Sequence, residues 1–435
     1  MSLTSLVQAA AAIESGETTS AELVGRHIAR ISELEARVRV FSWFDPDRAT
    51  ALAREADDPS TRAGTPLRGV PIGIKDIIDV AGLPCSCGTR ILEGRIPMES
   101  ATVVQRLERA GAITIGKTVT AELAFAAAGP TTNPWSERHT PGGSSMGSAA
   151  GVAAGFFPAA LGTQTNSSTI MPAALCGVVG FKPTGDRIPR AGIMSFSPTL
   201  DQVGTFTTTV ADAAVVASVL ADDPVDSWIS AQPSQRPRFV VARTGAWPEA
   251  TPAIREQFDH DVSVLASAGA SVDEAPLPGA FDQARATHRT IMAFEAARDV
   301  TQLIGANRSE QLSPQLSRFL AEGEGISPSD YHAAVNRGQE LAQEFERWVA
   351  PYDAVLTPAA PDEAPLLPST GDPRFCTTWT LIGAPAIVIP SGSGPQRLPI
   401  GLQLVGARHS EQKLLAAALF AEPLLDAPPL PAEAT

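Results

Sequence analysis

Cysteine is scarce in this sequence. Only four cysteines occur among 435 residues, at Cys85, Cys87, Cys176 and Cys376. They are too few and too scattered for a disulfide framework, and the Cys-x-Cys spacing of the first two is not that of a usual zinc site. We therefore expect four reduced, packed thiols in a cytosolic protein.

Basic residues and long apolar runs are scarce as well. The 33 Lys and Arg residues are outnumbered by 47 Asp and Glu residues, which gives a formal net charge of -14. This negative charge argues against nucleic acid or an anionic membrane as a partner. Gly, Pro, Ser or charged residues interrupt the longest apolar runs, so no membrane span is predicted, and the N-terminus lacks a signal-peptide pattern. A cytoplasmic location is expected.

The sequence does hold ample material for a core, because 44% of its 435 residues are hydrophobic, enough for one or two domains. Apolar spacing and a Thr19–Glu22 capping box predict N-terminal helices over residues 2–13, 21–38 and 45–56. A strand region, a helix, a strand and a short helix are expected next, over 66–80, 100–110, 112–116 and 118–125. This alternation predicts an α/β protein whose sheet is covered by helices on both faces.

The second half is predicted to add a helical block. We expect its helices to pack over the sheet and to shape a substrate pocket, over residues 285–303, 314–322 and 329–349. Further helices are expected over 209–221, 253–268 and 411–421, and strands over 238–243, 354–357, 386–390 and 400–405. A linker over 222–237 and a loosely held tail after residue 422 complete the prediction.

A glycine- and serine-rich stretch, Pro141–Thr184, carries two serine clusters. They are Gly142-Gly143-Ser144-Ser145 and Asn166-Ser167-Ser168. Small residues and then an apolar run separate them, which predicts a buried helix and a buried strand that delivers the second cluster beside the first. Two hydroxyls that meet at the end of a buried strand indicate nucleophilic chemistry. From the residues alone, Ser144 as a turn residue and Ser168 as a helix N-cap stay open.

Lys75 lies in a mostly apolar segment, Val70–Val80. A buried lysine is unfavourable unless it is paired or neutral. Two interpretations follow from the residues. Lys75 is either a strand-end lysine paired with Asp76 or Asp79, or a desolvated amine with a lowered pKa that acts as a base.

The ordered set of motifs resembles the amidase signature family of serine hydrolases. Besides the serine clusters, the resemblance rests on Gly69-Val70-Pro71-Ile72-Gly73-Ile74-Lys75-Asp76, Asn133-Pro134-Trp135, Gly177–Pro183, Ser197–Gly204, Leu356-Thr357-Pro358, Gly383-Ala384-Pro385-Ala386 and Pro399–Gly406. It covers nearly the whole chain. It implies one amidase domain with a mixed central sheet in an α/β/α arrangement, divided into N-terminal helices (1–60), a signature core (66–225), a mostly helical region (238–350), a C-terminal return to the sheet (351–422) and a tail (423–435).

The resemblance also implies a catalytic triad and a mechanism. Neutral Lys75 takes a proton from Ser144, which lies in a cis peptide and takes a proton from Ser168, the nucleophile. Ser144 then returns its proton to the leaving amine, and water hydrolyses the acyl-enzyme by the reverse relay. No metal or organic cofactor is implied, and no histidine. The implied oxyanion hole consists of the backbone N–H groups of Thr165, Asn166, Ser167 and Ser168.

The sequence departs from the family pattern in the loop before the nucleophile. Asn166 and Ser167 stand where many members have two glycines. Glycine permits positive φ, asparagine tolerates it fairly well, and serine does so less. A differently shaped loop is expected, and a catalytically weak relative that acts as a binding protein stays open.

A second departure concerns substrate charge. Ile170 and Met171, the candidate pocket residues, stand where many relatives carry an arginine. Where such an arginine binds a substrate carboxylate, its replacement removes the charge partner. We therefore predict an amidohydrolase, urethanase-like, that cleaves small neutral amides, anilides or carbamates. The alternative is the glutaminase-type subunit of an amidotransferase that works on charged tRNA, against which the acidic chain and the missing arginine argue. Family members are often dimers, which leaves a homodimer open.

Two motifs point to other enzyme classes. Gly111–Thr118 fits the P-loop pattern G-x-x-x-x-G-K-[ST], but it follows a predicted helix and its interior is strand-like, so we expect a strand that ends at Lys117. Gly143–Gly147 fits the G-x-S-x-G pattern of α/β-hydrolases, with Ser145 as nucleophile and His409 as a histidine in suitable chain order. The preceding segment is not strand-like, which disfavours that interpretation.

Overall fold

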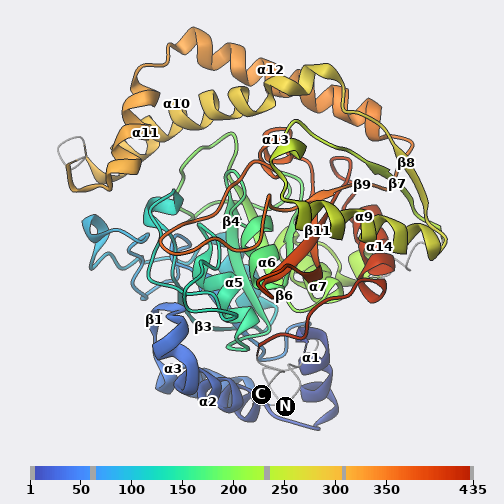
Figure 1. Cartoon of the computed structure of the whole chain (residues 1–435). Helices are drawn as coiled ribbons and strands as arrows, with labels where there is room; N and C mark the ends of the chain where they lie inside the picture. The colour runs from blue at the N-terminus through green and yellow to red at the C-terminus, as the bar shows by residue number, and fades with distance from the viewer. Residues whose placement is uncertain (1–4, 59–64, 230–235, 306–309, 432–435) are drawn as a thin grey trace.

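An eleven-stranded sheet forms the centre of the structure, a computed structural model that describes residues 5–58, 65–229, 236–305 and 310–431 (Figure 1). In chain order the strands are β1 (Phe41–Phe44), β2 (Pro71–Lys75), β3 (Ile113–Thr118), β4 (Ala159–Gln164), β5 (Val179–Lys182), β6 (Gln202–Thr207), β7 (Arg238–Val241), β8 (Ser271–Glu274), β9 (Ala354–Pro358), β10 (Ala386–Ser393) and β11 (Pro399–Val405). Their order in the sheet is β1-β3-β2-β4-β6-β5-β10-β11-β9-β7-β8. The sheet is mixed, because β2 pairs in parallel with β3 and β4, whereas β6 pairs antiparallel with β4 and β5.

Helices begin where the sequence supplies caps. Thr19 Oγ1 accepts the N–H of Glu22, whose carboxylate accepts the N–H of Thr19, so the predicted capping box is confirmed. The helices are α1 (Leu6–Ser15), α2 (Ser20–Val38), α3 (Pro46–Ala56), α4 (Thr102–Arg109), α5 (Met146–Ala153), α6 (Ile170–Cys176), α7 (Val210–Ala221), α8 (Val225–Ile229), α9 (Pro252–Ser267), α10 (Ala284–Ile304), α11 (Pro314–Glu324), α12 (Pro328–Val349), α13 (Thr377–Leu381) and α14 (Glu411–Ala421).

Both faces of the sheet are covered, which confirms the predicted α/β class. Along β10, Ile387 and Ile389 pack into a cluster with residues of α7, α9 and α14. Val388, between them, belongs to the larger cluster that contains residues of α5 and α6. Because successive side chains of a strand point to opposite faces, β10 is buried on both sides.

A helical layer made of α10, α11 and α12 arches over the top of the molecule in Figure 1. These three helices match the block predicted from the sequence. Within the layer α10 packs against α11 and α12, and it also packs against α13, which lies between the layer and the sheet. Through α13 the layer reaches the edge of the sheet where the strands β2 and β4 end.

Some predicted segments differ from the structure. The helix expected over 118–125 is wrong: Thr118 ends β3, and only the single 3-10 turn Glu122–Ala124 follows, because Leu123 and Ala124 adopt positive φ angles of 45° and 59°. The predicted linker contains the helix α8. Parts of the predicted N-terminal segment, linker, helical region and tail lie outside the described residues, at positions 1–4, 59–60, 230–235, 306–309 and 432–435.

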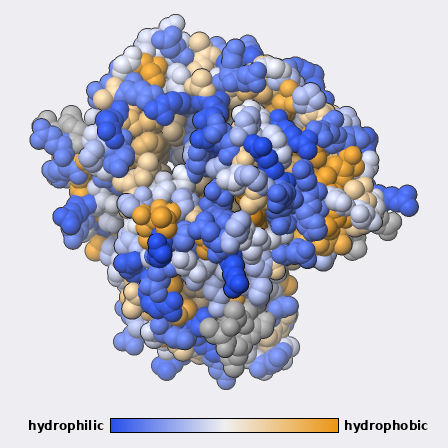
Figure 2. All heavy atoms as spheres, viewed as in Figure 1, coloured by the Kyte–Doolittle hydropathy of each residue, from blue (hydrophilic) through white to orange (hydrophobic). Residues whose placement is uncertain are grey.

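No helix among the described residues is long and apolar enough to cross a membrane. Figure 2 shows one face of the molecule, on which hydrophilic residues predominate and apolar side chains gather in separate small groups.

The segment that mimics a P-loop is a buried strand. Every residue of β3 is buried, as expected for a strand in the interior of an α/β sheet. Lys117 Nζ donates to Asp76 Oδ1 at 3.0 Å, and the two side chains are 0% and 3% exposed. The strand interpretation is confirmed, because this lysine is inside the core in an ion pair.

Replacing Lys117 by Met should leave the Asp76 carboxylate buried without its cation. We expect the free energy of unfolding, measured by urea denaturation, to fall by about 3–5 kcal/mol. The control Arg37→Met removes the exposed partner of Glu137 and should change it by less than ~1 kcal/mol. Equal small effects in both variants would contradict the importance of the buried pair.

Candidate active site

Three segments bring the predicted site residues to one edge of the sheet. β2 ends at Lys75, and β4, its parallel neighbour, leads directly into residues 165–168. Ser144 lies in the loop before α5, a helix that packs against β2 and β4. A Cβ on Gly147 would lie 2.3 Å from the carbonyl oxygen of Val40, so the small residues of α5 allow the close backbone approach predicted from the sequence.

Lys75 is fully buried and is held by two hydroxyls. Its Nζ lies 2.8 Å from Ser144 Oγ and 2.8 Å from Thr163 Oγ1. Burial lowers the pKa of Lys75 to about 7, although the nearby Asp201 and Cys87 act in the opposite direction. A neutral amine at this position can accept a proton from Ser144.

The alternative interpretation of Lys75, an ion pair at the end of the strand, is wrong. The carboxylate of Asp76 binds Lys117, and that of Asp79 binds Arg95 at 2.6 Å. Both neighbouring acids therefore have other partners, and Lys75 faces hydroxyls instead.

Ser144 is held by the backbone around it. The Gly143–Ser144 peptide is cis, as the family resemblance implies. The Ser144 carbonyl accepts the N–H of Ala121 at 3.0 Å, and the N–H of Gly143 donates to the carbonyl of Thr370 at 2.9 Å. A Cβ on Gly143 would lie 2.7 Å from the side chain of Thr370, so no larger residue fits before Ser144 without a shift.

The α/β-hydrolase interpretation fails on geometry. Ser145 is fully buried at the start of α5, where its Oγ donates to the carbonyl of Thr163 at 3.3 Å. His409 is 56% exposed and faces Asp186, 3.8 Å away. Neither residue lines the cavity that contains Ser144, so the G-x-S-x-G match is structural.

One cavity of about 220 Å³ brings the two serine clusters together. Ser144 and all of residues 165–168 line it, as does Met171. Ile170, the other candidate pocket residue, does not line it, because its side chain is fully buried in the main core. The structure therefore places one of the two predicted pocket residues in the wall of the cavity.

The loop over residues 165–168, in which Asn166 and Ser167 replace the usual glycines, has no residue with a positive φ angle. Neither Asn166 nor Ser167 is among the non-glycine residues with positive φ. Asn166 is instead fastened to α13: its Oδ1 accepts from Thr377 Oγ1 at 2.7 Å, and its carbonyl accepts from Thr380 Oγ1 at 2.6 Å. Neither position therefore requires the positive φ that glycine permits, and the differently shaped loop stays a prediction.

The end of the same loop is fixed by Gln164. Its Oε1 accepts the N–H groups of Thr169 and Ile170, at 2.9 and 3.0 Å, at the start of α6. Its Nε2 donates to Thr380 Oγ1 at 3.0 Å, so one side chain joins the loop, α6 and α13. Ser168 is thereby held between two anchored segments, and Thr169, not Ser168, is the N-cap residue of α6.

Thr165, at the start of the loop, is held by two residues that sequence reasoning missed. Its Oγ1 donates to Asp201 Oδ1 at 2.5 Å, and its carbonyl lies 2.8 Å from His288 Nε2. Burial lowers the pKa of His288 to about 4, so a neutral imidazole donates to this carbonyl. Asp201 lay inside a quoted motif, whereas nothing local marks His288, which arrives on α10.

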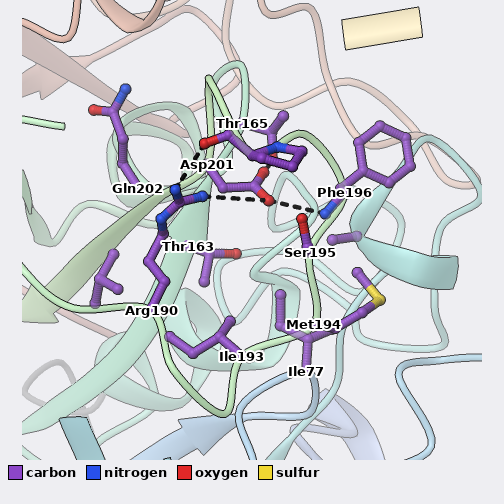
Figure 3. Close-up of a pocket in the computed structure, with 13 residues that line it drawn as sticks. Ile77, Thr163, Thr165, Arg190, Ile193, Met194, Ser195, Phe196, Asp201 and Gln202 are labelled. Atoms are coloured by element: carbon purple, nitrogen blue, oxygen red, sulfur yellow. Dashed lines mark hydrogen bonds and ion pairs between the residues drawn. The ribbon is translucent and has the colours of Figure 1, made fainter. Parts of the chain in front are cut away.

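A second cavity of about 200 Å³ lies next to the first and shares Ala124, Thr165 and Phe196 with it (Figure 3). Thr163, the partner of Lys75, also lines it. Figure 3 shows Arg190 directed toward Asp201, with 3.9 Å between Nη1 and Oδ2.

A sequence model described as Amidase matches residues 22–415. The chain therefore belongs to the amidase family, and the resemblance to amidase signature enzymes is confirmed. Among curated proteins it is similar to the A-subunit of glutamyl-tRNA(Gln) amidotransferase from Chloroflexus aggregans, with 35% identity over 93% of each chain. The corresponding protein of Synechococcus sp. is 36% identical over 93% of this chain and 94% of its own.

Solved structures of amidases share the whole fold. A crystal structure of an amidase has a TM-score of 0.89 and 29% identity, and covers 97% of this chain and 100% of its own. The native peptide amidase of Stenotrophomonas maltophilia has a TM-score of 0.85 and 28% identity over 99% of each chain. These relatives support an activity on carbon–nitrogen bonds.

The pKa of Lys75 predicts the pH dependence of hydrolysis. Only neutral Lys75 can accept a proton, so kcat/KM should rise with pH through about 7 and fall roughly tenfold per unit below it. Lys182 is the control, because burial lowers its pKa to about 7 as well. Lys182→Met should keep the limb near pH 7, and a profile that is flat from pH 5 to 8 in the native protein would contradict the role of Lys75.

Proposed function

We propose that this protein hydrolyses the carbon–nitrogen bond of small neutral amides through an acyl-enzyme on Ser168, with Ser144 and Lys75 as the proton relay. One observation carries the proposal. The fully buried Lys75 Nζ lies 2.8 Å from Ser144 Oγ, and Ser144 lines the same cavity as Ser168.

The chemistry follows from this placement. Neutral Lys75 accepts the Ser144 proton while Ser144 accepts that of Ser168, whose oxygen attacks the substrate carbonyl. The backbone N–H groups of residues 165–168 stabilise the oxyanion, and the loss of one such donor typically raises the barrier by a few kcal/mol. The relay then protonates the leaving amine and, in reverse, activates the water that releases the acid.

The wall of the cavity supports a neutral, partly apolar substrate. Met171 stands in it where a basic side chain would attract a carboxylate. Of the described residues that line the cavity, Arg289 alone is charged, and its Nε and Nη2 already donate to the carboxylate of Glu322. Anilides and carbamates belong to the same neutral class and are included in the proposal.

A glutaminase subunit of an amidotransferase is the second candidate. It is favoured by the 35% identity with the amidotransferase A-subunit of Chloroflexus aggregans over 93% of each chain. The formal net charge of -14 disfavours direct contact with tRNA. Release of ammonia from glutamine faster than from neutral amides would support this candidate instead.

Hydrolysis of a neutral nitroanilide and a matched aryl carbamate tests the proposal. Ser168→Ala should lower kcat/KM by at least ~10³-fold, because the nucleophile is lost. Ser167→Ala is the matched control: it removes the neighbouring hydroxyl, retains the backbone N–H, and should stay within about tenfold of native activity. Equal losses in both variants would contradict the assignment, and no turnover by the native protein would point to a binding role.

The relay is tested with the same substrates. Lys75→Ala should lower kcat by at least ~10²-fold, since it removes the base that accepts the Ser144 proton. His409→Ala should leave the rate unchanged, because this side chain lies outside the cavity. A loss with His409→Ala and none with Lys75→Ala would restore the α/β-hydrolase interpretation.

A further inference from the structure

Two phenylalanines, supported by a third with a nearly parallel ring, form one side of the cavity that Ser144 and Ser168 line. Phe125 and Phe196 line it, with ring centroids 5.4 Å apart and an interplanar angle of 16°. Phe319 supports them, 4.5 Å from Phe125 and 6.2 Å from Phe196. These rings come from three separate parts of the chain, so the nearly parallel wall is a product of the fold.

An arginine lies at the end of this wall. Arg289, on α10, lies with its guanidinium 5.3 Å from the ring centroid of Phe319, and it also lines the cavity. Its Nε donates to Glu322 Oε1 at 2.7 Å, and its Nη2 donates to Glu322 Oε2. A two-point contact of this kind offsets the charge of the guanidinium and occupies its Nε–Nη2 edge, one of the two edges with which an arginine can bind a carboxylate at two points.

The other described residues that line the cavity are uncharged. Met171, Met292 and Pro373 contribute apolar surface, and Thr370 contributes an uncharged side chain. The cavity measures about 220 Å³. An apolar cavity of roughly 150 Å³ is enough to take up benzene, so this one has room for a single aromatic ring. Parallel aromatic side chains favour an offset stack with a further planar ring.

We propose that Phe125 and Phe196 form a subsite for the planar aromatic group of a neutral amide, and that Glu322, by offsetting the charge of Arg289, disfavours carboxylate-bearing amides. This rests on the proposed function and narrows it to aromatic amides without a carboxylate near the ring. Selectivity against carboxylates depends on the ion pair between Arg289 and Glu322, a residue of the neighbouring helix α11.

The charge part is tested with two nitroanilides whose acyl chains have equal length, one ending in a methyl group and one in a carboxylate. Glu322→Gln removes the negative charge beside Arg289 and should shift the kcat/KM ratio toward the carboxylate substrate by about tenfold, as expected for one charge-assisted contact. Glu340→Gln is the matched control, because it breaks another exposed Arg–Glu pair of the helical layer, with Arg337. An unchanged ratio in Glu322→Gln would overturn this part.

The aromatic part is tested with benzamide against cyclohexanecarboxamide, and with acetanilide against N-cyclohexylacetamide. Phe125→Leu should lower the preference for the planar ring in at least one pair by about 2–10-fold, mainly through KM. Phe44→Leu is the control, since Phe44 stacks on Phe41 at 4.7 Å and does not line the cavity. No change in either pair would overturn the subsite.

Binding separates this inference from the proposed function. If the native protein cleaves none of these amides, the proposed function fails, and calorimetry of the same compounds with the Ser168→Ala variant still decides on the subsite. Tighter binding of benzamide than of cyclohexanecarboxamide, lost in Phe125→Leu, would support it. Equal binding of both rings would overturn it.

Discussion

The buried amine of Lys75 is the constraint on which the rest of the site depends. An ammonium group in this position is fully shielded from solvent, and this burial disfavours the charged form more than the nearby Asp201 favours it. The two acids nearest in sequence are occupied by Lys117 and Arg95. Lys117 on β3 is thus in an ion pair, whereas Lys75 on the neighbouring strand β2 contacts hydroxyls. Because Lys75 lacks such a pair, a neutral amine that can accept a proton lies beside Ser144.

The anchored loop shows how a departure from the family pattern is accommodated. Asn166 contributes a side-chain acceptor that glycine lacks, and α13 supplies hydroxyls to both that acceptor and the adjacent carbonyl. Gln164 links α13 to the start of α6, because its Nε2 donates to Thr380 Oγ1 and its Oε1 accepts the N–H of Thr169. The rigidity of the loop therefore comes from contacts with a short helix that is distant in the sequence, instead of from backbone conformations reserved for glycine.

Much of this arrangement could be predicted from the sequence, and there are physical reasons why the rest could not. Strong periodicity located the long helices, and the motif around Ser144 and Ser168 located the cavity. The turn after β3 resembled a helix because its residues are good helix formers, yet Leu123 adopts a left-handed conformation that composition does not reveal. His288 and Arg289 carry no local signal, since their importance arises only where α10 meets the loop and the cavity.

Residues within little more than one turn of the helix α10 contact both the 165–168 loop and the cavity. His288 supports the carbonyl of Thr165, while Arg289 and Met292 form part of the wall that a substrate would contact. A substitution that reshapes this wall by shifting α10 would therefore also move the support of the Thr165 carbonyl. A change in substrate preference would therefore also affect turnover. We expect specificity in this lineage to change through paired substitutions, one in α10 and one in α13, which holds the 165–168 loop through Asn166.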